Sequence, residues 1–180
     1  MIVTSIRFPQ HPTTMSIIGS TATSTFQPRL FRIDVPTIDC FFSGTGDMFA
    51  ALTVVRLREA VVAAAPQPDL TRTRSWQSPD DVLAADLPLA TAVEKVLGSM
   101  HAVLEKTMQA RANELDALHD DDNDDETTEG GGDERARAGW WEKRMHLRKT
   151  KAAEVRVTRC LEDLRNPKVE WKAVALGEED

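Results

Sequence analysis

Four consecutive residues, Gly44, Thr45, Gly46 and Asp47, form the part of the sequence best suited to chemistry. A glycine-rich turn that leads into a helix leaves free backbone N–H groups at the positive end of that helix, where phosphate binds well. The glycines let the backbone approach an anion closely, and the Thr45 hydroxyl can donate a hydrogen bond to it. Asp47 would then stand where a carboxylate can take a proton from an alcohol that attacks the phosphate.

The spacing separates this turn from two common phosphate-binding motifs. A dinucleotide-binding fingerprint needs a third glycine at position 49, which is occupied by Phe49. A P-loop needs the string Gly-Lys-Ser or Gly-Lys-Thr four residues after its first glycine, and this string does not occur after Gly44. A purely structural role also stays open at this point, because Asp47 as a helix cap with two turn-forming glycines would give the same string.

An extended segment should precede the turn and a helix should follow it. Three segments rich in β-branched or alternating apolar residues predict strands: Ile2–Phe8, Met15–Thr21 and Leu30–Val35. A helix is predicted from Asp47 to about Ala64, and Pro66 and Pro68 end it. Its first turns are apolar nearly all round, which predicts that they are buried.

A second helix is predicted to begin near Pro88, because proline is well tolerated in a first turn. Apolar residues then recur at steps of three and four, which indicates a face that packs in the core: Val93, Val96, Leu97, Met100, Leu104 and Met108. His101 lies beside this stripe, and we expect it to be a packed or interfacial histidine rather than a metal ligand.

The last third contains an acidic run, residues 120–126, followed by three glycines at 130–132. It lacks the spacing of a calcium-binding loop, so we expect a disordered loop over residues 119–139. This loop would separate a core, residues 1–118, from a final helix and strand of the same domain, residues 140–180. The helix is expected over most of Glu142–Arg165 and the strand over Lys168–Leu176.

Composition limits the classes of partner. The net charge of −7 argues against nucleic acid or an anionic membrane, although the basic segment 142–165 invites a nucleic-acid hypothesis. That segment lacks interleaved aromatic residues, and no run of roughly 18 apolar residues is present to span a bilayer. With no signal-peptide pattern at the N-terminus, we expect a cytoplasmic protein whose Cys40 and Cys160 are reduced thiols.

The turn and its flanks resemble one family. Ser43–Leu52 resembles the anion-hole motif of the ribokinase-like small-molecule kinases, and of pyridoxal kinase in particular. Three more segments resemble that family: Val3–Ser5, the helix Ser99–Thr107 and the closing Leu164–Leu176. The resemblance implies an α/β fold, namely the C-terminal part of a ribokinase-like three-layer sheet flanked by helices.

The resemblance also implies roles for the turn. Asp47 would be the general base that deprotonates the 5′-hydroxymethyl group of pyridoxal, with ATP as the phosphate donor. Gly44, Thr45 and Gly46 would form the anion hole that stabilises the transferring γ-phosphoryl group.

Further roles follow for residues before the turn. Thr4 and Ser5 would contact the nucleotide phosphates, and Ile38, Asp39 and Cys40 would lie along the nucleotide. The family implies a divalent cation such as Mg²⁺, for which no residue of this chain is assigned. Pyridoxal and ATP are the expected partners, and a homodimer stays open.

Pyridoxal kinases are considerably longer, and this chain resembles only their C-terminal part. The missing part supplies most of the pyridoxal pocket, the lid and the metal-binding acids, so we expect a truncated chain that is weakly active alone. Two alternatives stay open: an enzyme like hydroxymethylpyrimidine kinase, which shares the glycine–acid turn, and a non-catalytic paralogue that binds nucleotide or a partner kinase.

Overall fold

In the computed structural model of the chain, the residues described are 1–40, 42–65, 76–124 and 154–177, with the isolated positions 143, 147 and 150. Four antiparallel strands form one sheet in the order β1-β2-β3-β4. Their bounds are β1 Ile2–Ile6, β2 Thr14–Ala22, β3 Pro28–Pro36 and β4 Val174–Leu176. The three predicted N-terminal strands are therefore confirmed, whereas the closing strand is shorter than predicted and pairs only over its last three residues.

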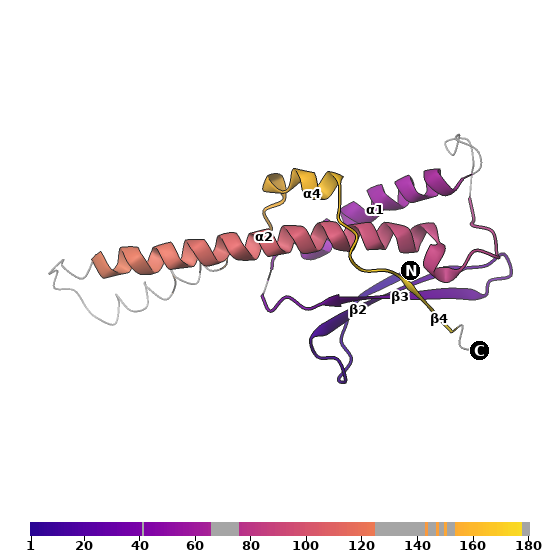
Figure 1. Cartoon of the computed structure of the whole chain (residues 1–180), viewed down its shortest axis with the longest axis horizontal. Helices are drawn as coiled ribbons and strands as arrows, with labels where there is room; N and C mark the ends of the chain where they lie inside the picture. The colour runs from indigo at the N-terminus through magenta and orange to yellow at the C-terminus, as the bar shows by residue number, and fades with distance from the viewer. Residues whose placement is uncertain are drawn as a thin grey trace.

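The helices lie on one face of this sheet (Figure 1). They are α1 Thr45–Ala64, α2 Pro88–Asp124 and the short α4 Leu161–Arg165, with two single 3₁₀ turns, η2 Ala84–Asp86 and η4 Val157–Arg159. The predicted starts of the first two helices are correct within two residues. The mixed α/β class is confirmed, and among the described residues the second face of the sheet carries no helix. None of the described helices is apolar enough over a sufficient length to cross a lipid bilayer.

The main core lies between the sheet and α2. Ile17 and Ile33 are paired across β2 and β3, and both are fully buried against Val93 of α2. Gly19 is paired with Phe31 two residues further along the same strands, and a Cβ at Gly19 would lie only 2.0 Å from the phenyl ring. The glycine therefore makes room for the largest fully buried side chain of the protein's described core.

A second cluster joins α1 to α2 and to the C-terminal segment. Met48 of α1, Val103 of α2 and Cys160 pack together and are all buried. Arg56 is also buried, with 7% exposure, and it donates hydrogen bonds to the carbonyls of Leu164 and Arg165 while pairing with Glu59 at 2.7 Å. This cation satisfies the free carbonyls at the end of α4 and holds α4 against α1.

Two predictions about the helices are wrong. The first turns of α1 are not buried all round, because Ala50, Ala51 and Val54 are exposed. The helix α2 continues to Asp124, so residues 119–124 of the expected loop are helical. Once a helix has formed, adding a residue costs little, and that lets it extend into a polar run. Residues 125–139 of the expected loop lie outside the described residues.

The helix expected over most of Glu142–Arg165 is present at both described ends of this span but interrupted between them. Positions 143, 147 and 150 are helical and α4 covers Leu161–Arg165, whereas residues 155–156 are not helical and Glu154 forms an isolated bridge with Ser43 beside the turn. The N–H of Arg156 donates to the Thr107 hydroxyl at 3.3 Å, and Cys160 is buried in the second cluster. Contacts with α1 and α2 therefore override the local helical preference of this segment.

Candidate active site

The Gly44–Asp47 turn opens helix α1. Gly44 is the N-cap with φ 88°, a left-handed conformation that favours glycine, and its carbonyl accepts the first helical hydrogen bond from Met48 N–H at 3.1 Å. Asp47 is therefore the third residue of the helix and not its cap, and its side chain is exposed. The reading of Asp47 as the N-cap is therefore wrong, although an acidic residue in the first turn still stabilises a helix through its dipole.

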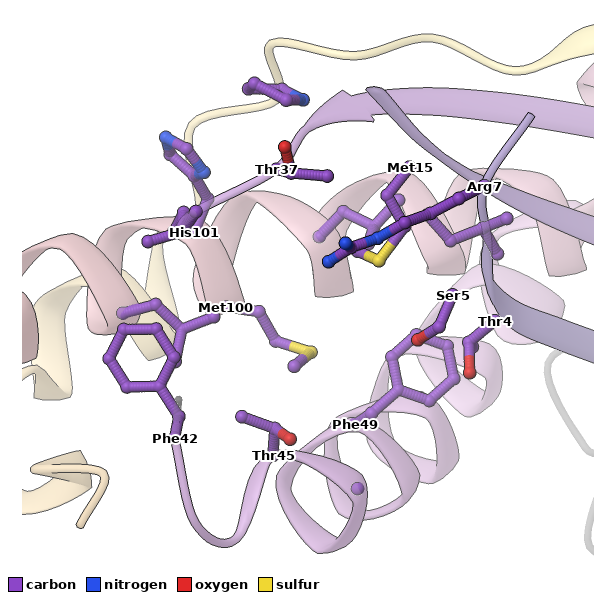
Figure 2. A pocket seen from close by; sticks show the side chains of 16 residues that line it. Thr4, Ser5, Arg7, Met15, Thr37, Phe42, Thr45, Phe49, Met100 and His101 are labelled. Carbon is purple, nitrogen blue, oxygen red and sulfur yellow. The ribbon is translucent and has the colours of Figure 1, made fainter. Parts of the chain in front are cut away.

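A cavity of about 350 Å³ opens beside this helix start. Figure 2 shows the side chains that surround it, which come from the ends of β1, β2 and β3, from the turn and from the middle of α2. We call it the turn cavity, and its lining consists of Thr4, Ser5, Arg7, Met15, Ile17, Pro36, Thr37, Ile38, Phe42, Thr45, Gly46, Phe49, Leu97, Met100, His101 and Leu104.

The turn cavity brings together five of the residues singled out from the sequence: Thr4, Ser5, Ile38, Thr45 and Gly46. The other four, Gly44, Asp39, Cys40 and Asp47, do not line it. Cys40 is instead held near α2, where its sulfur accepts a hydrogen bond from Arg111 Nη1 at 2.7 Å.

An irregularity in β1 explains how two consecutive residues reach one cavity. Successive side chains of a regular strand point to opposite faces, so Thr4 and Ser5 would be separated. Ser5 has φ 62°, and the register with β2 shifts between Val3 and Ile6. This bulge turns the end of β1 so that both hydroxyl-bearing residues line the turn cavity.

Several lining residues were not identified from the sequence. Leu97, Met100 and Leu104 belong to the apolar stripe that predicts core packing, yet they form the α2 wall of the turn cavity. His101 is packed as predicted, because its ring lies edge-on to that of Trp171 with 4.7 Å between the ring centroids. Its Nε2 atom lies 3.0 Å from the Oε1 atom of Glu105. The position of Glu105 four residues after the histidine was the sequence signal for this pair.

The far side of α1 has a different character. At roughly 100° per residue, Ala50, Ala51, Val54 and Val62 all lie within about 60° of Asp47 around the helix. All five residues are exposed, Val54 to 71%. We call this surface the open face of α1, and exposed Arg58 also lies on it, about 20° from Asp47 around the helix. The carboxylate of Asp47 thus lies on an uncovered, mostly apolar surface, while Thr45 and Gly46 line the turn cavity.

The turn cavity suits an anion attached to an apolar group. Backbone N–H groups at the start of α1 and the hydroxyls of Thr4, Ser5 and Thr45 supply hydrogen-bond donors. Phe42, Phe49 and Met100 supply apolar walls on which a flat ring can lie. None of the described lining residues is acidic, so no carboxylate at the wall would repel a phosphate.

Comparison with known proteins found similar sequences and structures but no matching protein-family model. A Schizosaccharomyces pombe protein named "Putative pyridoxal kinase C18.10" is 32% identical over 108 residues, which are 59% of this chain and 28% of that protein. The chain thus spans less than a third of this curated relative.

Solved structures show the same partial likeness. Pyridoxal kinase from Leishmania donovani in complex with ADP matches with a TM-score of 0.56 and 16% identity, over 97% of this chain and 39% of that chain. The same enzyme in complex with ADP and pyridoxamine matches with a TM-score of 0.54, again over 97% of this chain. At this identity the structures establish the fold alone. In sequence and in ribokinase-like fold, this chain is similar to one part of pyridoxal kinase.

Proposed function

We propose that the chain carries the phosphate-transfer part of a pyridoxal kinase, which uses ATP to phosphorylate the 5′-hydroxymethyl group of pyridoxal. The observation that carries this proposal is the convergence of Thr45 and Gly46, from the Gly44–Asp47 turn, with Thr4 and Ser5 around one cavity. The pyridoxal kinase relatives in sequence and in structure support it. The product would be pyridoxal 5′-phosphate, formed by vitamin B6 salvage in the cytoplasm.

In this proposal each part of the turn has a separate task. Asp47 accepts the proton of the attacking hydroxyl group, which makes the oxygen a better nucleophile. The N–H groups of Thr45 and Gly46, with the Thr45 hydroxyl, stabilise the charge on the transferring phosphoryl group. Gly44 shapes the turn, because its left-handed backbone lets α1 begin at Thr45, directly after it.

The remaining residues would hold the nucleotide. Thr4 and Ser5 donate to its phosphates from the opposite wall of the turn cavity, and Ile38 contributes an apolar surface. Asp39 and Cys40 follow directly along the chain, so any contact they make with the nucleotide would come from outside the cavity lining.

A divalent cation such as Mg²⁺ belongs to this proposal only as a companion of ATP. In the parts of the chain that the structure describes, no group of three or more His, Cys, Asp or Glu side chains is placed to hold a metal ion. The donors of the turn cavity are hydroxyl and N–H groups, which do not fit the carboxylate-rich sites that divalent cations prefer. We therefore derive no catalytic step through a metal bound by these residues.

A second candidate is a protein that binds nucleotide without catalysis. The exposed position of Asp47 on the open face of α1 favours it, because nothing in the described residues would hold an alcohol there. Pyridoxal and ATP are the expected ligands of the first candidate, and a homodimer is compatible with both. Nucleic acid and membranes are not expected as partners of either.

The test combines binding and turnover. ADP binding to the 180-residue chain is measured by calorimetry, and pyridoxal phosphorylation is followed by chromatography of the product. We expect measurable ADP binding and weak turnover, with Asp47→Asn lowering turnover by roughly 100-fold or more and leaving ADP affinity unchanged. Asp81→Asn, at an exposed position outside the turn cavity, is the control that should change neither.

Three results would contradict parts of this scheme. Absence of ADP binding removes the nucleotide site. Turnover that is the same in Asp47→Asn as in the wild type removes the base. Fast pyridoxal phosphorylation by the chain alone contradicts the expectation that the described part of the fold is insufficient.

A further inference from the structure

Arg7 is a cation in the turn cavity that the proposed function does not use. It follows directly on β1, one residue after the strand ends, and it lines the cavity with Thr4 and Ser5. Figure 2 shows its side chain extending from the end of β1 into the cavity rather than away from it. The guanidinium group is therefore directed at the space in which a ligand would lie.

The charge of Arg7 is not balanced within the cavity. Arg7 is exposed, and its guanidinium group makes no ion pair or hydrogen bond with any other described residue. The other ionisable lining residue, His101, is already paired with Glu105 at 3.0 Å. In a protein with a net charge of −7, an arginine at a cavity wall without an acidic lining residue indicates complementarity to an anionic ligand.

The hydrogen-bond donors near Arg7 indicate which class of anion would bind, namely a polyphosphate. A guanidinium group donates in a planar fork that matches two phosphate oxygens, and hydroxyl groups such as those of Thr4 and Ser5 add single donors. The start of α1 supplies a second donor group from another wall of the same cavity. Two donor groups on different walls fit a chain of phosphates better than a single phosphate.

We infer that Arg7 binds the nucleotide's phosphate chain together with Thr4 and Ser5, while the Gly44–Asp47 turn holds the terminal phosphoryl group. This inference rests on the proposed function. Arg7 would neutralise charge on the diphosphate that leaves during phosphoryl transfer, so it should contribute to ADP affinity as well as to ATP affinity. It is a binding residue with a role distinct from the proton transfer assigned to Asp47.

The test compares Arg7→Gln, which removes the charge at similar length, with Arg7→Lys, which keeps the charge and loses the fork. Arg32→Gln is the matched control, because Arg32 lies on β3 in an ion pair with Asp34 at 3.2 Å and does not line the cavity. Calorimetry measures the affinities for ADP, tripolyphosphate and adenosine at several salt concentrations. Thermal melting followed by circular dichroism checks that each variant is folded.

We expect Arg7→Gln to weaken ADP and tripolyphosphate binding by roughly 10- to 100-fold, as for loss of a hydrogen-bonded charge. Its affinities should depend less on salt, Arg7→Lys should be intermediate, and adenosine binding should stay within about twofold. If wild type and Arg7→Gln bind ADP equally, the inference fails and the proposed function stands. If the wild type binds neither ADP nor tripolyphosphate, both fail together.

Discussion

The two sides of α1's first turn differ sharply. On one side Thr45 and Gly46 line a cavity of about 350 Å³ whose other walls come from three strands and from α2. On the other side lies the open face of α1, where Asp47 stands among exposed alanine and valine side chains and Arg58. The donors that we propose for nucleotide thus line one cavity, whereas the described residues form no such enclosure around Asp47.

The structural comparison has the same partial character. Nearly all of this chain aligns with Leishmania donovani pyridoxal kinase, but it spans only 39% of that chain. An exposed, mostly apolar helix face with a carboxylate at its end is a surface that other protein can cover. In the proposed function, an acceptor site beside Asp47 requires such a cover.

A valine pair gives the largest expected contrast in stability. Val103→Ala removes buried methyl groups between α1 and α2 and should lower the free energy of unfolding by about 2–3 kcal/mol. Val54→Ala makes the same chemical change on the open face of α1, where the side chain is 71% exposed, and should change it by less than about 0.5 kcal/mol. Urea denaturation of both variants measures the difference.

Equal losses in the two valine variants would contradict this contrast. They would mean that the open face is covered in solution, for example by a second copy of the chain. Sedimentation at two protein concentrations distinguishes that case, because self-association would depend on concentration.

Alanine substitutions of Gly44 and Gly46 should differ less in stability than the two valine variants. They also separate the effect of the turn's backbone conformation from its effect on ADP binding. Gly44→Ala places a side chain at φ 88° and should cost roughly 1–2 kcal/mol of stability, although no atom lies within 4 Å of the new Cβ. Gly46 is inside the helix with equal space around it, so Gly46→Ala should be neutral or slightly stabilising. Its methyl group should nevertheless weaken ADP binding, because it enters the cavity wall where phosphate would approach.

Thermal melting and ADP calorimetry on both variants check this pair. A Gly46→Ala protein with unaltered ADP affinity would show that close backbone approach at this position is unnecessary. A Gly44→Ala protein as stable as the wild type would show that the turn can adopt another conformation.

The parts of this site that the sequence predicted depend on local patterns. The glycine turn, the start of α1 and the three strands follow from residue types within a few positions. The bulge at Ser5 and the path of Arg7 were not predictable in this way, because a positive φ at a serine reflects packing rather than local preference. The bridge between Glu154 and Ser43 joins residues more than 100 positions apart, and no periodicity in residues 142–165 indicates it.

The smallest expected effect concerns the ion pair between Lys106 of α2 and Asp163 of α4, whose Nζ and Oδ2 atoms are 2.6 Å apart. The hydrogen bond to Asp163 raises the pKa of the Lys106 ammonium group above its usual value, although desolvation opposes it. A raised pKa means that the stabilisation is fully present below the unfolded value of about 10.4 and is lost as the pH rises through the higher folded value. Lys106→Gln should therefore lower the urea midpoint slightly at pH 8, and the gap to the wild type should close only as the pH rises through the raised pKa of the folded protein.

Because the pair is solvent-exposed, its contribution should also shrink with added salt, as it does for surface ion pairs. The control is Lys168→Gln, which removes a second exposed pair with Glu170 that lies on a single extended segment and joins no helices. A Lys106→Gln effect no larger than the Lys168→Gln effect would show that the ion pair does not hold α4 to α2. The contacts left for that task are the hydrogen bonds of Arg56, the hydrogen bond that Ser99 of α2 donates to the Asp163 carbonyl at 2.8 Å, and the buried cluster around Cys160.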